Sequence, residues 1–189
     1  MKETIEIRWH GRGGQGAKTA AQFLAEAALD AGKFIQAFPE YGPERAGAPM
    51  RAFTRISDKP ITVHSGVTNP DAVVVIDPTL INSEVLEGLA DTGALVMNSE
   101  KDPQTMRKTL NFSGGKVATV DATKISLEVL GLPMPNTPMI GALLKTMAVV
   151  SMDSVNEQVK KKFLKKLGEE KTNANILAIK RAYEEVKIG

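Results

Sequence analysis

The stretch TIEIRWHGRGGQGAKT, residues 4–19, decides the fold. Residues 4–10 alternate in polarity and stop at a glycine, which is the pattern of a β-strand. The glycines that follow match G-x-G-x-x-G between Gly11 and Gly16. Residues 17–31 are rich in alanine, leucine and glutamate, with apolar side chains at helical spacing. The sequence therefore predicts a strand, a glycine loop and a helix in that order.

The glycine loop is the candidate binding site, and it allows two interpretations. Glycines let the backbone turn with positive φ and approach a ligand closely, while the first turn of a helix offers unpaired N–H groups and a partial positive charge. The loop suits an anion or a phosphorylated cofactor, or it only makes a tight turn between strand and helix. The candidate residues for such a contact are Gly11, Arg12, Gly13, Gly14, Gln15, Gly16, Lys18 and Thr19.

Two nucleotide-binding patterns match this loop only in part. A dinucleotide fold expects an acidic residue about 20 residues past the glycines, at the end of the second strand. Glu40 lies 24 residues past Gly16, directly after a proline, so a free-standing NAD- or FAD-binding oxidoreductase is an alternative. A phosphate loop of the NTPase type expects lysine directly after its last glycine, whereas Lys18 comes one place late. That delay turns the lysine about 100° around the helix, which disfavours an NTPase.

The rest of the chain predicts strands and helices in alternation. The expected strands are residues 34–38, 50–56, 72–76, 94–97 and 116–120, with 61–63 as a hairpin partner. The expected helices are residues 80–90, 122–130 and 139–150, followed by a charged helix whose apolar stripe runs over 155–167 and a last helix over 175–186. This order predicts a single domain over residues 1–189. Its class is α/β, a three-layer α/β/α, Rossmann-like fold with a mostly parallel, mixed sheet and a helical C-terminal region.

Composition excludes several classes of function. The chain has 189 residues, 42% hydrophobic and 24% charged, and its net charge of +2 does not indicate a nucleic-acid-binding protein. Because there is no cysteine, the chain can hold no disulfide, thiolate zinc site or cysteine-bound iron–sulfur cluster. His10 and His64, its two histidines, are too few for a self-contained histidine metal site, and we expect both to be structural. Without a signal sequence or a long apolar run, we expect a cytoplasmic chain that does not enter a membrane.

Three separated stretches carry a resemblance to a known family. They are residues 11–19 (GRGGQGAKT), 38–51 (FPEYGPERAGAPMR) and 136–142 (NTPMIGA). In this order and spacing the sequence resembles the gamma subunits of the 2-oxoacid:ferredoxin oxidoreductases, most closely those of the pyruvate enzyme, pyruvate synthase. The resemblance extends over nearly the whole chain, from residue 5 to residue 186.

The resemblance implies a subunit of a larger enzyme. That enzyme converts a 2-oxoacid and coenzyme A to acyl-CoA and carbon dioxide and reduces ferredoxin. In the family, thiamine diphosphate and magnesium lie on the alpha and beta subunits, and the iron–sulfur clusters lie on the beta and delta subunits. The absence of cysteine agrees with that division. We therefore expect this chain to carry no catalytic residue, to bind no cofactor firmly and to be inactive alone.

The resemblance and the residues together suggest two surfaces. Coenzyme A carries a diphosphate and a 3′-phosphate, so a glycine loop beside Arg12 and Lys18 suits it. The segment rich in glycine, proline and charge is expected to contact other subunits through Tyr41, Glu44, Arg45 and Arg51. Asp77 is expected to cap a helix beginning near Thr79, and residues 136–138 resemble the N-terminal cap of an apolar helix.

Overall fold

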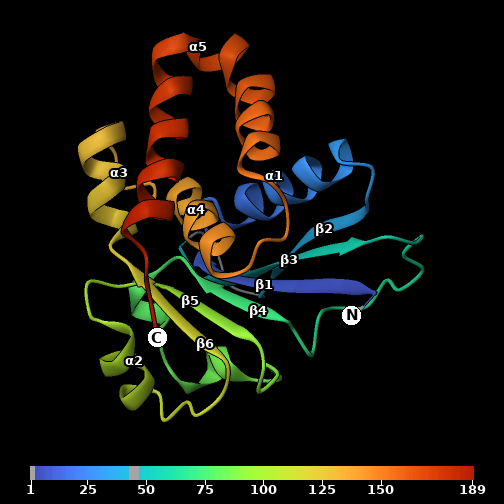
Figure 1. Ribbon diagram of the computed structural model, residues 1–189, viewed down its shortest axis with the longest axis vertical. Helices are drawn as coiled ribbons and strands as arrows, with labels where there is room; N and C mark the ends of the chain where they lie inside the picture. The colour runs from blue at the N-terminus through green and yellow to red at the C-terminus, as the bar shows by residue number, and fades with distance from the viewer. Residues whose placement is uncertain (1–2, 43–46) are drawn as a thin grey trace.

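One mixed sheet forms the centre of the molecule. The computed structural model describes residues 3–42 and 47–189, and seven strands of this part are ordered β2-β3-β1-β4-β5-β6-β7 (Figure 1). The strands are β1 (Thr4–Arg12), β2 (Phe34–Tyr41), β3 (Pro49–Ser57), β4 (Ala72–Val75), β5 (Ala94–Asn98), β6 (Lys116–Val120) and β7 (Lys187–Ile188). The helices are α1 (Ala17–Asp30), η1 (Pro78–Leu80), η2 (Ser83–Leu86), α2 (Pro103–Thr109), α3 (Ala122–Leu130), α4 (Asn136–Thr146) and α5 (Met152–Glu185).

The central strands β1, β4, β5 and β6 run parallel, and an antiparallel wing is attached at β1. All four residues of β4 are buried, which explains why its sequence is continuously apolar instead of alternating. In the wing, β3 pairs antiparallel with both β1 and β2. The short β7 pairs antiparallel with β6 at the other edge. The predicted α/β class with its mixed sheet is confirmed.

Helices cover the two faces of the sheet unequally. α1, α4 and α5 lie on one face, where the buried Ile7 and Trp9 of β1 join the larger hydrophobic core. On the other face, η2 and α2 cover β4, β5 and β6, and their Val85 and Met106 pack in a second core with Val73 of β4. Over the wing that second face carries charged side chains instead. This arrangement leaves the strand ends near β1 accessible.

Two helices approach closely at the C-terminal end of the chain. A Cβ added to Gly141 of α4 would collide with the backbone oxygen of Ile179 in α5, so only glycine permits this contact.

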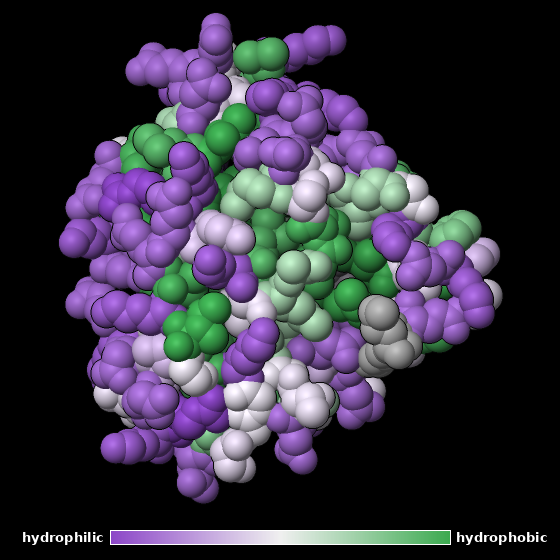
Figure 2. Space-filling model, in the orientation of Figure 1, coloured by the Kyte–Doolittle hydropathy of each residue, from purple (hydrophilic) through white to green (hydrophobic). Residues whose placement is uncertain are grey.

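α5 is interrupted at Gly168, where φ is 80° and ψ is 173°, and its two arms fold back on each other (Figure 1). Figure 2 shows that the charged surface around α3 and α5 is interrupted by apolar side chains. The predicted helical C-terminal region is confirmed.

Several predicted elements differ in the structure. Residues 80–90 form no single helix, because Asp77 and Asn82 each accept a backbone N–H two residues later and start separate short turns, η1 and η2. Residues 61–63 form no strand. The predicted helix over 139–150 is shifted and forms α4, since Pro138 is tolerated in a first turn, where N–H groups lack helical partners. Ser151 caps α5, and α2 and β7 were not predicted.

In the part of the chain that the structure describes, no helix combines the length and hydropathy that a membrane crossing requires.

Candidate functional site

The glycine loop is a tight turn closed by the side chain of Gln15. The Gln15 N–H donates to the Arg12 carbonyl at 3.1 Å, and the Arg12 N–H donates to Oε1 of Gln15 at 2.8 Å. Gly14 and Gly16 have φ of 95° and 80°, values that side chains with a Cβ rarely adopt. The loop therefore needs glycine at these two positions to pass from β1 into α1.

Gln15 also connects the loop to the end of β4. Its Nε2 donates to Asp77, and the Arg12 guanidinium lies 3.5 Å from the same carboxylate and 3.0 Å from Oγ1 of Thr79. Asp77 accepts the backbone N–H of Thr79 at 2.8 Å, so its predicted capping role is confirmed. Burial opposes ionisation of Asp77, but hydrogen bonds from Thr79 and Gln15 and the charge of Arg12 outweigh it. The pKa of Asp77 is consequently lowered, and the carboxylate is charged and compensated.

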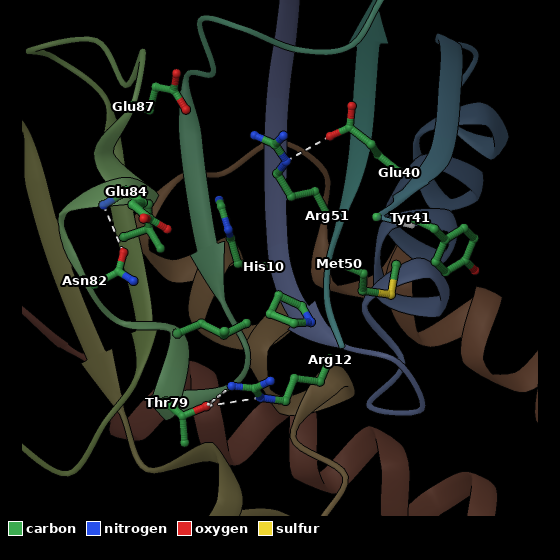
Figure 3. Close-up of a pocket in the computed structure, with 14 residues that line it drawn as sticks. His10, Arg12, Glu40, Tyr41, Met50, Arg51, Thr79, Asn82, Glu84 and Glu87 are labelled. Atoms are coloured by element: carbon green, nitrogen blue, oxygen red, sulfur yellow. Dashed lines mark hydrogen bonds and ion pairs between the residues drawn. The ribbon is translucent and has the colours of Figure 1, made fainter. Parts of the chain in front are cut away.

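A hollow of about 1020 Å³ opens beside this cluster on the face that helices leave uncovered (Figure 3). It lies at the carboxyl ends of β1 and β4, where α/β sheets commonly bind ligands. Its lining residues are His10, Arg12, Glu40, Tyr41, Gly42, Pro49, Met50, Arg51, Thr79, Leu80, Asn82, Glu84, Val85 and Glu87. Figure 3 shows Arg12 and Thr79 paired on one side and Arg51 and Glu40 paired on another.

Three neighbouring strands place one row of polar side chains in the hollow. Arg51 of β3 is in register with both His10 of β1 and Glu40 of β2, and its Nε lies 2.8 Å from the Glu40 carboxylate. Burial, together with the charges of Arg8 and Arg51, lowers the pKa of His10 to about 3. His10 is therefore neutral near pH 7, and its Nε2 accepts a hydrogen bond from Nε of Arg8 at 3.0 Å.

Arg8 is a residue of this region that the sequence analysis missed. It is 1% exposed, and its guanidinium donates to the carbonyl oxygens of Val85 at 3.1 Å and Glu87 at 2.6 Å. These bonds hold η2 over β1 and so build one wall of the hollow. Arg8 could have been found from the alternation of polar residues along β1, because this alternation places Arg8, His10 and Arg12 on one face of the sheet.

The structure separates the predicted loop residues instead of gathering them. Arg12 faces the hollow and Gln15 faces Asp77, while Thr19 lines a second groove on the helical side of the molecule. Lys18 is exposed and forms no ion pair with any other described residue. Asn136, from the third family-like stretch, meets the loop, because a Cβ added to Gly16 would lie 2.5 Å from its Nδ2.

The predicted contact residues lie partly at the rim of the hollow. Tyr41 is 62% exposed, and the side chain of Arg51 is 45% exposed although it pairs with Glu40. Glu44 and Arg45 lie outside the described residues. Within the described residues, no group of three or more histidine, aspartate or glutamate side chains is arranged to hold a metal ion.

The dinucleotide pattern does not match the strand order. In such a fold the acidic residue ends a strand next to the glycine-loop strand. Here β3 lies between β1 and β2, and Glu40 on β2 pairs with Arg51. The geometry gives no support to a free-standing NAD- or FAD-binding enzyme.

Fold and site define an α/β protein with a glycine loop at the carboxyl ends of its parallel strands. The chain belongs to the family described as pyruvate ferredoxin/flavodoxin oxidoreductase, whose sequence pattern matches residues 6–185. It is 53% identical to pyruvate synthase subunit PorC of Thermotoga maritima, over 98% of this chain and 96% of the relative. It is 47% identical to the pyruvate/ketoisovalerate oxidoreductase common subunit gamma of Pyrococcus furiosus, over 97% and 98%.

Solved structures agree with this assignment. The crystal structure of the Thermotoga maritima subunit PORC matches with a TM-score of 0.90 and 49% identity, covering 100% of this chain and 99% of that one. A 2-oxoglutarate:ferredoxin oxidoreductase from Magnetococcus marinus matches with a TM-score of 0.76 at 21% identity, which shows the fold; this chain covers 31% of its length. The predicted gamma-subunit identity is confirmed, and the chain is a subunit of a 2-oxoacid:ferredoxin oxidoreductase complex.

Proposed function

We propose that this subunit helps to bind and orient coenzyme A in an enzyme that oxidises pyruvate to acetyl-CoA and carbon dioxide. The choice of pyruvate rests on the names of the relatives, which are pyruvate synthase or pyruvate/ketoisovalerate oxidoreductase subunits. The whole sequence has no cysteine, so cysteine-bound iron–sulfur clusters must lie on other chains of such an enzyme.

The glycine loop is the part of this chain that suits coenzyme A. The N–H groups of its first helical turn are not used by the helix, since the first helical bond runs from Ala20 to the Gly16 carbonyl. α1 has neither a capping side chain nor an acidic residue in that turn, so nothing in the helix competes with an anion. Lys18 supplies a cation on the exposed side, and Arg12 supplies one toward the hollow.

The reactive groups belong to partner subunits in this proposal. Thiamine diphosphate, magnesium and iron–sulfur clusters are assigned to alpha, beta and delta subunits, and ferredoxin accepts the electrons. Thiamine diphosphate supplies the carbanion chemistry of decarboxylation when it is bound there. This chain contributes binding, orientation of coenzyme A and exclusion of water at the subunit boundary. The cytoplasm is the expected location of such a complex.

The rim of the hollow is proposed as a contact with those partners. Tyr41 is a large exposed aromatic side chain beside the Arg51–Glu40 pair, and aromatic and arginine side chains are enriched in protein interfaces. Glu44 and Arg45 continue the same segment in the sequence. A Tyr41→Ala variant should lower the yield of assembled complex. The matched control is Phe34→Ala, which removes an aromatic side chain 44% exposed at the other end of β2.

Coenzyme A titration of the assembled complex tests the main proposal. The paired change Arg12→Ala and Lys18→Ala should raise the KM for coenzyme A about tenfold or more and leave the KM for pyruvate unchanged, because each lost charge contact contributes about 1 kcal/mol. Lys180→Ala, on the exposed surface of α5, is the control. An unchanged KM for coenzyme A in an intact complex would contradict the proposal.

A further inference from the structure

β2 is the outer strand of the antiparallel wing, and in the described part of the chain no strand lies beside its outer edge. It has 8 residues and pairs with β3 without a break in register. Proteins commonly protect such an edge with a very short strand, a bulge, a lysine or a proline. β2 is long, its register with β3 contains no bulge, and it holds no lysine. Its proline, Pro39, lies near the end of the strand, so residues 34–38 (FIQAF) are unprotected.

The hydrogen bonds of the sheet show which backbone groups of β2 face outward. Successive residues of a strand direct their N–H and C=O groups to opposite sides. In β1, the carbonyls of Glu6 and His10 accept the N–H groups of Asp71 and Ile76 on the β4 side. The odd-numbered residues of β1 therefore bond to β3. The registers of β1 with β3 and of β3 with β2 extend this alternation across the wing.

By this alternation, the odd-numbered residues of β2 direct their backbone groups away from β3. Pro39 agrees with the assignment, because a proline inside a sheet has its nitrogen on the unpaired side of an edge strand. Ile35 and Ala37 each offer an N–H and a C=O on that side, and no other described residue bonds to these groups. The edge therefore presents a row of donors and acceptors that a further strand can bind.

We propose that the outer edge of β2 pairs with the same edge of a second copy of this chain. Two identical strands can pair antiparallel about a two-fold axis, so each copy supplies the same residues. With the axis at Gln36, Ile35 of one copy lies opposite Ala37 of the other. All the outward groups of these two residues are then paired. With the axis at Ala37 instead, the carbonyl of Ile35 would face Pro39, which has no N–H.

The composition of the edge favours a second copy as the occupant. Residues 34–38 carry no charge, so two copies meet without like charges opposite each other. Phe34 of one copy lies opposite Phe38 of the other, and aromatic pairs across strands stabilise a sheet. Glu40 lies beyond the paired residues and is held by Arg51 of its own chain. Pairing joins the two mixed sheets into one and removes both open edges.

A single cysteine at the axis tests the pairing, because the chain has no cysteine of its own. In Gln36→Cys the two new side chains lie opposite each other at a non-hydrogen-bonded pair. Their Cα atoms are then about 4.5 Å apart, a separation that a disulfide can span. Mild oxidation should convert most of the purified full chain to a covalent dimer. Ile188→Cys, an exposed position on β7 at the opposite edge of the sheet, is the matched control and should stay monomeric over the same time.

Analytical ultracentrifugation measures the pairing without a cross-link. The unmodified chain should change from monomer to dimer as its concentration rises. Ala37→Pro removes an outward N–H and no bond to β3, so it should raise the dissociation constant of the dimer about tenfold or more. Phe34→Ala keeps every outward backbone group and should still form the dimer. If Ala37→Pro does not fold, the cysteine variants and the exchange measurement below decide the question.

Hydrogen exchange shows whether β2 is the paired edge. The amides of Ile35 and Ala37 should become protected as the dimer forms, whereas those of Gln36 and Phe38, which bond to β3, should be protected at every concentration. A chain that stays monomeric, with Gln36→Cys cross-linking no faster than Ile188→Cys, would overturn the proposal. A dimer in which Ile35 and Ala37 exchange freely would also overturn it. So would protection of these two amides that appears only when other subunits are added, because another subunit would then occupy the edge.

Discussion

The side-chain amide of Gln15 donates to the carboxylate of Asp77, 62 residues further along the chain. The oxygen of the same side-chain amide accepts a hydrogen bond from the backbone N–H of Arg12. One side chain therefore closes the glycine loop and fixes it to the end of β4. Glycines make this turn sterically possible, but they do not hold it in one conformation. The polar link to Asp77 supplies that restraint.

Replacing Gln15 should therefore loosen the loop. Gln15→Ala removes both hydrogen bonds and leaves the Arg12 N–H without its described partner, so we expect a loss of about 1–2 kcal/mol in the free energy of unfolding. Urea denaturation measures this loss, and Gln104→Ala, at an exposed position of α2, is the control. A Gln15→Ala chain as stable as the control would show that the link does not restrain the loop.

Arg8 should contribute more to stability than any exposed arginine. Arg8→Met removes a buried guanidinium and leaves the carbonyls of Val85 and Glu87 without their donor, so the expected loss is about 2–4 kcal/mol. Hydrogen exchange should also become faster across residues 83–89. Arg51→Met, which breaks a half-exposed ion pair, should cost less than about 1 kcal/mol. Equal losses in the two variants would contradict the role given to Arg8.

His10 should make the fold sensitive to mild acid. Its folded pKa of about 3 lies below the usual value near 6.5, so the unfolded chain binds a proton first. The stability that His10 provides is complete above pH 6.5 and declines as the pH falls toward 3, by at most about 1.4 kcal/mol per pH unit. His10→Gln should flatten this slope between pH 6.5 and 5. A His10 ring signal that titrates near pH 6.5 would be incompatible with this account.

Gly141 should tolerate no side chain. A methyl group there meets the backbone oxygen of Ile179, which cannot move without separating α4 from α5, so Gly141→Ala should cost about 3 kcal/mol. Thermal unfolding measures this loss. Gly42→Ala is the matched control, because the Cβ at that position meets no atom of the described residues within 4 Å. Similar melting temperatures for the two variants would mean that the helices repack freely.

Local sequence signals predicted the fold class well. The alternating residues 4–10, the glycine loop and the continuous apolar run of β4 each have one physical explanation, and the structure contains all three elements. The helix predicted over residues 80–90 was wrong. The apolar spacing of these residues is helical, but the side chains of Asp77 and Asn82 cap two separate short turns, η1 and η2. Such capping hydrogen bonds compete with continuation of the helix, and the spacing of apolar residues does not show which of the two prevails.

The candidate site was only partly predictable, because its neighbours come from distant parts of the chain. The loop and its glycines were found from the sequence. The meeting of Asn136 with Gly16 depends on how α4 packs against α1, and the burial of Arg8 depends on where η2 lies. Neither relationship has a local signature. Residues that a motif places together, such as Arg12 and Lys18, can face different surfaces once the strand ends and the helix begins.

Omission of this subunit from a reconstituted complex tests the central claim most directly. The measurement is coenzyme A-dependent reduction of ferredoxin with pyruvate, by alpha, beta and delta subunits with and without this chain. We predict that the rate falls at least tenfold without the chain, returns when the wild-type chain is added, and is absent for the chain alone. An unchanged rate in its absence, with the same dependence on coenzyme A, would contradict the claim.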